Sequence, residues 1–65
     1  MATKEEEIIM ATIACIEKYG IEGATIRRIG MQAGVNSASI NYYFRSKDAL
    51  IQRVLDIALG NAFDF

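Results

Sequence analysis

The chain has 65 residues, so it can form one small domain with a modest hydrophobic core. Its apolar fraction of 52% argues against disorder, and a single cysteine without any histidine excludes an internal disulfide and argues against a metal site. No apolar run approaches the roughly 18 residues of a membrane span, and the acidic run near the start does not match a signal peptide. We therefore expect a cytoplasmic protein with neither a metal nor a cofactor.

The net charge of −1 is divided unevenly along the chain. Residues 1–24 hold two lysines and five glutamates, a net charge of −3, whereas residues 25–53 hold five basic residues and one aspartate, a net charge of +4. Asp56 and Asp64 account for the remaining −2. A positive central segment is what a DNA-facing surface needs, although a solvated helical face can have the same balance.

The first predicted helix covers residues 4–19. Thr3 and Glu6 match a capping box, and three consecutive glutamates suit the positive end of a helix dipole. Cys15 has no second thiol or activating base near it in the sequence, which favours a packed thiol over a reactive one. Gly20 is expected to end the helix. The residues that form a broad stripe at helical spacing are Ile8, Ile9, Thr12, Ile13, Ile16 and Tyr19.

A second helix is predicted over residues 26–33, with Thr25 as its N-cap. Gly30 inside so short a helix costs about 1 kcal/mol relative to alanine, and the close approach of another helix would offset this cost. Gly34 can take a positive φ where the chain leaves the helix.

The third predicted helix, over residues 37–43, has two unlike faces. Asn36 and Ser37 are both suitable N-caps. The face opposite the core holds small side chains, one amide and one aromatic ring: Ser37, Ala38, Ser39, Asn41 and Tyr42. Such a surface can approach the edges of DNA bases closely, and serine and asparagine can donate or accept hydrogen bonds there. The alternative is a connecting turn with little helical order.

The core is expected to tie these two short helices to the rest of the chain. Ile40, Tyr43 and Phe44 can face it at i, i+3 and i+4, and an apolar residue inside the turn can anchor the turn. The side chains expected to be among the most buried are Ile29, Val35, Ile40 and Phe44.

Two short helices joined by a turn of three or four residues form a helix-turn-helix motif, here over residues 25–44. The second helix of such a motif can enter the major groove of DNA. We therefore expect the function of the chain to lie in this segment.

A fourth helix is predicted over residues 47–59, with Ser46 as its N-cap and Gly60 at its end. Phe63 and Phe65 follow without a partner helix in this sequence. These aromatic residues suggest contact with something absent here, so we expect the chain to be the front end of a longer protein.

Together these features resemble the N-terminal DNA-binding domain of the tetracycline-repressor (TetR) family of bacterial transcription regulators. The resemblance covers nearly the whole chain and rests on Tyr19-Gly20, Thr25, Ile29, Ala33-Gly34-Val35, Ile40, Tyr43-Phe44, Ser46-Lys47 and Leu50. It implies an all-α, homeodomain-like three-helix bundle over residues 1–60, with a helix-turn-helix motif and the start of a linking fourth helix. Residues 61–65 would then begin an absent C-terminal domain for effector binding and dimerisation.

The same resemblance implies roles for individual residues. It assigns Thr25 and Lys47 to phosphates that flank the recognition helix, and Arg27 to a base or a phosphate. Asn41 stands where many relatives have an aromatic residue, so it can either pair with adenine or contact a phosphate. Arg28 is interpreted as a solvated helix charge. The residues assigned to the groove-facing surface are Ser37, Ala38, Ser39 and Tyr42.

The resulting hypothesis is sequence-specific DNA binding by a ligand-responsive transcriptional regulator that acts as a repressor. The resemblance implies a homodimer on a palindromic double-stranded operator and a small-molecule effector bound outside this fragment, with no membrane association. The alternative is a small helical protein-interaction module that uses Phe63, Phe65 and the fourth helix. An enzyme is not expected, because Ser37, Ser39 and Cys15 have no histidine to activate them.

Overall fold

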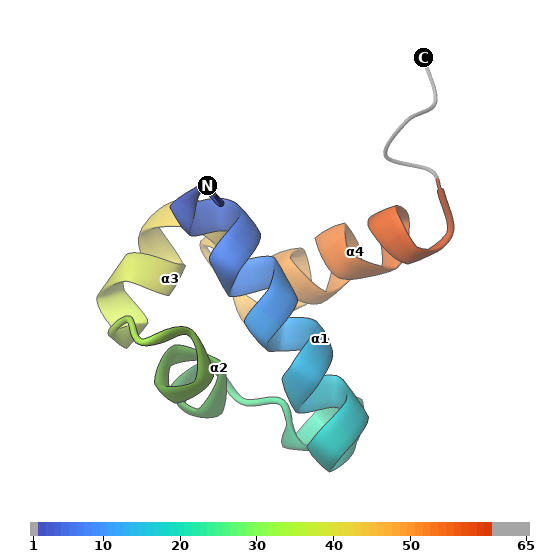
Figure 1. The fold of residues 1–65 in the computed structure, drawn as a ribbon, viewed down its shortest axis with the longest axis horizontal. Helices are drawn as coiled ribbons and strands as arrows, with labels where there is room; N and C mark the ends of the chain where they lie inside the picture. Colours follow the sequence, from blue (N-terminus) through green and yellow to red (C-terminus); the bar gives the residue numbers. More distant parts are fainter. Residues whose placement is uncertain (1, 61–65) are drawn as a thin grey trace.

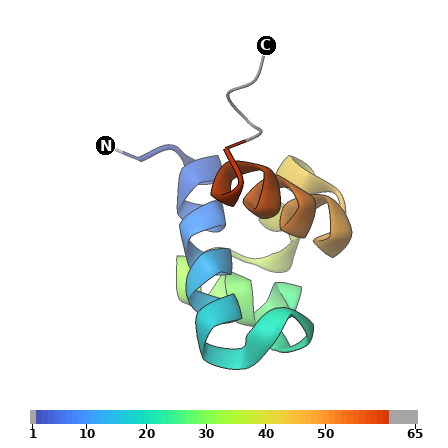
Figure 2. The same cartoon turned by 90° about the vertical axis from the view of Figure 1, so that its right-hand side faces the viewer.

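A computed structural model describes residues 2–60, which fold into four α-helices and contain no strand (Figure 1). Helix α1 spans Lys4–Gly23, α2 spans Ile26–Ala33, α3 spans Ser37–Phe44 and α4 spans Lys47–Ala58. Helix α1 packs against both α2 and α4, while α3 packs against α2 and α4. Figure 2 shows α4 lying across α1 at a large angle. The expected all-α class is confirmed.

Each helix begins at a residue whose side chain accepts a hydrogen bond from a backbone amide three positions later. This bond satisfies one of the amides that the first helical turn leaves without a partner. At α1 the bond is reciprocal, because the backbone amide of Thr3 donates to Glu6 Oε1 over 2.9 Å, as the predicted capping box requires. The four N-cap residues are Thr3, Thr25, Asn36 and Ser46.

Helix α1 continues one turn beyond its predicted end. Gly20 has the positive φ expected of a helix terminus, at 79°, but it forms a kink rather than an end. Residues 21–23 make another helical turn, because the amide of Ala24 donates to the carbonyls of Gly20 and Ile21 over 3.1 and 3.3 Å. The side chain of Ala24 is fully buried, so packing holds this last turn in place.

The core draws one fully buried large side chain from each helix: Ile8, Ile29, Ile40 and Leu50. Phe44 is also buried, as predicted, and Cys15 is a packed thiol. Val35 was expected among the most buried residues, but it is only half-buried at the edge of the core. Its side chain packs against the core from that edge, and its backbone amide donates to the carbonyl of Gly30 over 2.9 Å.

Three residues assigned to the core from their spacing are exposed instead. Tyr43 is 40% exposed, and Ile13 and Tyr19 lie at the border of the stripe predicted for α1. A stripe read from spacing alone is wider than the surface that two neighbouring helices cover. The expectations for Phe63 and Phe65 concern residues outside the described part of the chain.

The corner between α2 and α3 depends on two glycines. Gly34 ends α2 with a φ of 75°, in the left-handed region that favours glycine. The carbonyl of Gly30 accepts hydrogen bonds from the amides of Gly34 and Val35, the latter over 2.9 Å. A Cβ atom added at Gly30 would lie 2.7 Å from the carbonyl oxygen of Val35 and 3.5 Å from Ile40 Cδ1. The expected close approach at Gly30 is therefore present, made mainly by the turn rather than by a helix.

Phe44→Ala should reduce the free energy of unfolding of the chain by about 3–5 kcal/mol, because it empties a site that is only 8% exposed between α1, α3 and α4. In so small a domain this loss can exceed the whole stability. The measurement is urea or thermal unfolding followed by circular dichroism. The control is Asn41→Ala, at an exposed site on the same helix, which should change stability by no more than about 0.5 kcal/mol. Equal melting of the two variants would show that Phe44 does not support the core.

Gly30→Ala should destabilise the chain by about 1–3 kcal/mol, because the new methyl group meets the backbone oxygen of Val35. The direction of the change in stability is informative, since intrinsic helix propensity alone would make the alanine variant more stable by about 1 kcal/mol. The matched control is Gln32→Ala, at an exposed position of the same helix, which should be neutral or slightly stabilising. A Gly30→Ala variant as stable as the parent would mean that the corner can open at no cost.

Candidate nucleic-acid interface

The outer face of α3 is built from side chains that leave the backbone accessible. Ser37, Ala38 and Asn41 are exposed, and Tyr42 is 81% exposed, as predicted for a surface that faces a groove. Ser39 is half-buried, so it is the least accessible member of the expected set. No long charged side chain stands on this helix between its N-cap and its last residue. A base edge could therefore come close to the helix.

Tyr43 adds a second aromatic ring at the end of this face. The rings of Tyr42 and Tyr43 pack edge to face, with centroids 5.1 Å apart and an interplanar angle of 86°. Sequence reasoning assigned Tyr43 to the core because it follows Ile40 by three residues. The only sequence signal against that assignment is its hydroxyl group, which prefers water or a hydrogen-bond partner.

Thr25 and Lys47 stand at the first turns of α2 and α4, on either side of α3 in the sequence. The Thr25 hydroxyl accepts from the amide of Arg28 over 3.2 Å, which leaves its proton available to a further acceptor. Lys47 Nζ donates to the carbonyl oxygen of Glu22 over 3.3 Å, and an ammonium group has two more N–H bonds to donate. Both residues can therefore hold the fold together and still contact a phosphate.

Arg28 has a structural role that sequence reasoning missed. Its guanidinium group lies over the ring of Tyr19, 4.2 Å from the ring centroid, and its Nη1 donates to the carbonyl oxygen of Gly23 over 3.0 Å. It thus joins the start of α2 to the last turn of α1, so this exposed charge has a structural role beyond the solvated helix charge that was expected. That last turn has no basic residue of its own, which is the one signal in the sequence that a cation from elsewhere could be used there.

The acidic and basic residues are mostly unpaired with each other. Among residues 2–60 the one ion pair joins Lys4 and Glu7 at 3.7 Å, on the exposed start of α1. Arg27 and Arg45, both exposed, make neither an ion pair nor a side-chain hydrogen bond within the same range. Positive charge beside the outer face of α3 is therefore not cancelled by neighbouring carboxylates of the described chain.

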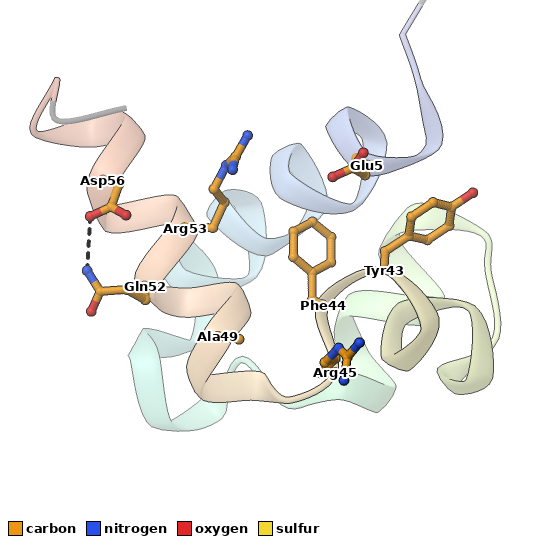
Figure 3. Close-up of a pocket in the computed structure, with 8 residues that line it drawn as sticks. All are labelled: Glu5, Tyr43, Phe44, Arg45, Ala49, Gln52, Arg53 and Asp56. Carbon is orange, nitrogen blue, oxygen red and sulfur yellow. Dashed lines mark hydrogen bonds between the residues drawn. The ribbon is translucent and has the colours of Figure 1, made fainter. Parts of the chain in front are cut away.

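A surface groove of about 400 Å³ lies between the start of α1, the end of α3 and α4 (Figure 3). It is open to solvent, and its lining mixes two carboxylates with two guanidinium groups. Residues 2–60 contain no cluster of three histidine, cysteine, aspartate or glutamate side chains that could hold a metal ion. None of the helices described here is long and apolar enough to cross a membrane. The residues that line the groove are Glu5, Tyr43, Phe44, Arg45, Ala49, Gln52, Arg53 and Asp56.

Known proteins with similar sequences are bacterial regulators. A regulator named "HTH-type transcriptional regulator BetI 2", from Chromohalobacter salexigens, is 36% identical over 61 residues, which are 94% of this chain and 30% of that protein. "HTH-type transcriptional regulator BetI" from Proteus mirabilis is 35% identical over 52 residues, which are 80% of this chain and 26% of that protein. The chain thus spans less than a third of the length of these curated relatives. No solved structure matches it.

Residues 8–54 match the family described as "Bacterial regulatory proteins, tetR family". The matched range begins in the second turn of α1, ends inside α4 and contains the whole helix-turn-helix motif. It also contains the glycine corner and the exposed face of α3 described above. On these grounds the chain belongs to the tetR family of bacterial regulatory proteins and carries the DNA-binding domain of that family.

Proposed function

We propose that residues 1–60 are the DNA-reading domain of a longer, ligand-responsive transcriptional repressor that binds double-stranded DNA in a sequence-specific way. The observation that carries this proposal is the composition of the exposed face of α3. This face holds small side chains and an aromatic ring instead of the usual charged residues, and the close approach at Gly30 fixes the corner that positions the helix. Residues of this kind discriminate bases by hydrogen bonds and methyl contacts in the major groove.

The proposed contacts fall into two groups. Ser37, Ala38, Ser39, Asn41 and Tyr42 face the base edges, with Ser39 limited to its exposed part. Thr25, Arg27 and Lys47 contact phosphates or, for Arg27, a base. The first turns of α2 and α4 support this division, because their partly satisfied donors flank the recognition helix in the sequence.

The whole protein is proposed to be a cytoplasmic homodimer on a palindromic operator and not an enzyme. Two recognition helices then meet successive major grooves on one side of the duplex, about 34–36 Å apart. A small-molecule effector would bind in a domain beyond residue 60, because this chain is too small to hold both a core and an enclosed ligand pocket. Helix α4 leads toward that domain, so a shift of α4 would change the separation of the two recognition helices.

The alternative of a protein-interaction module is less well supported. Its main residues, Phe63 and Phe65, lie outside the described part of the chain. Selection of duplexes from a random-sequence pool with the whole protein distinguishes the two functions. Enrichment of one palindromic sequence supports the repressor, and no enrichment with no salt-sensitive binding to any duplex rejects it.

Asn41→Ala in the whole dimer should weaken binding to the selected operator by about 1–3 kcal/mol and change binding to random DNA little, if Asn41 reads a base. Tolerance should also widen at one symmetric pair of base positions. The measurement is fluorescence anisotropy on both duplexes, with the exposed amide variant Gln32→Ala as control. Equal losses on both duplexes would make Asn41 a backbone contact, and no loss on either would remove it from the interface.

Lys47→Ala should weaken operator and random duplexes about equally, and should reduce the slope of log K against log salt by about 0.9 for each bound copy of the chain. The reason is that one phosphate contact and its released counterion are lost. The control, Lys4→Ala, removes the same charge from an exposed residue at the start of α1. An unchanged slope for Lys47→Ala would mean that its ammonium group serves only the carbonyl of Glu22.

A further inference from the structure

The corner between α3 and α4 contains an unusual backbone conformation at Arg45. Its φ and ψ angles are 69° and −43°, and it is the one residue other than glycine with a positive φ among residues 2–60. The amide of Ser46 donates to the carbonyl of Phe44 over 2.7 Å, across Arg45. This is a γ-turn of the rarer, strained kind. A residue with a side chain is costly here, since glycine adopts such angles without the steric penalty.

The position of Arg45 follows from a second hydrogen bond. Its amide donates to the carbonyl of Asn41 over 2.9 Å, so Arg45 lies one helical turn beyond the centre of the exposed face of α3. Lys47 follows two residues later, at the first turn of α4. Arg45 therefore stands between the surface proposed to read bases and a residue proposed to contact a phosphate.

The Arg45 guanidinium group has no ion pair or side-chain hydrogen bond among residues 2–60, a property that it shares with Arg27 and Arg53 but not with Arg28 and Lys47. Arg28 and Lys47 both donate to carbonyls in the last turn of α1. Arg45 is exposed and makes no ion pair or side-chain hydrogen bond within residues 2–60. Figure 3 shows its side chain leaving the corner apart from the carboxylates of Glu5 and Asp56, which line the same groove. Nothing in the described fold uses its charge.

We propose that Arg45 is a further DNA contact of this domain, which binds a backbone phosphate just beyond the C-terminal end of the recognition helix. The inference rests on the proposed function and adds a contact that lies outside the set implied by the family. Backbone strain of this kind gathers at functional sites, because a strained residue persists only when the surroundings fix it. A guanidinium group held at a strained corner, without an internal partner, is suited to a fixed phosphate.

The test compares salt dependence in variants of the whole protein that carries this chain. The probe is a mixed-sequence duplex of about 30 base pairs, because a phosphate contact does not depend on sequence. Arg45→Gly removes the charge and also accepts the positive φ, so the corner can fold without a side chain. Arg45→Lys keeps a positive charge. Arg53→Ala is the matched control: it removes an exposed arginine that lines the same groove from α4.

The expected result is a reduction of the log–log salt slope by about 0.9 per bound copy for Arg45→Gly, and the parent slope for Arg45→Lys and Arg53→Ala. Circular dichroism should give the parent helix content for all three variants. An unchanged slope for Arg45→Gly overturns the proposal, and so does an equal reduction for Arg45→Gly and Arg53→Ala, which would reflect net charge alone. A parent protein that binds the duplex without salt dependence would instead reject the proposed function itself.

Discussion

The contact between Gly30 and the carbonyl oxygen of Val35 is the constraint on which the position of the outer face of α3 depends. It brings the turn against α2 more closely than any side chain would allow, and Ile40 then packs against the same glycine. The Gly30 carbonyl also accepts the amides that leave α2, so the helix end and the corner are fixed by one residue. The outward direction of α3 follows, because Ile40 on its inner face is held in the core. A domain of this size has few other contacts with which to set that angle.

The last turn of α1 is a second site that links helices, because side chains of α2 and α4 form hydrogen bonds to it. Beyond the kink at Gly20, the carbonyls of Glu22 and Gly23 accept hydrogen bonds from Lys47 of α4 and Arg28 of α2. The negative end of α1 is thus stabilised by residues of the DNA-binding half of the sequence. The basic residues concentrated in residues 25–53 therefore stabilise the fold, in addition to giving the proposed interface its positive charge. A shift of α4 would have to break or carry along the hydrogen bond from Lys47 to the carbonyl of Glu22, which links the start of α4 to the last turn of α1.

The local features of the fold could be predicted from the sequence, whereas the limits of the core could not. The four N-caps and the positive φ of Gly34 follow from interactions within a few residues, and they are present as expected. The burial of Val35 and Tyr43 depends on which helix covers them, and spacing carries no information on that. The continuation of α1 past Gly20 depends on the burial of Ala24, which is also a tertiary effect. The outer face of α3 was predictable from local spacing, whereas the hydrogen bond of Arg28 to Gly23 and the positive φ of Arg45 depend on how the helices pack.

The paired rings of Tyr42 and Tyr43 address a difficulty that an exposed face of small side chains creates. Serine, alanine and asparagine offer little area, so the proposed DNA interface would need a larger group to add contact energy. In that proposal Tyr42 is the larger group, but a ring that is 81% exposed would lose rotational freedom on binding. Its edge-to-face contact with Tyr43 already restricts the ring in the free protein, and α3 holds both residues in adjacent positions. Tyr43 is itself 40% exposed, so the two rings form one aromatic pair on the surface of α3.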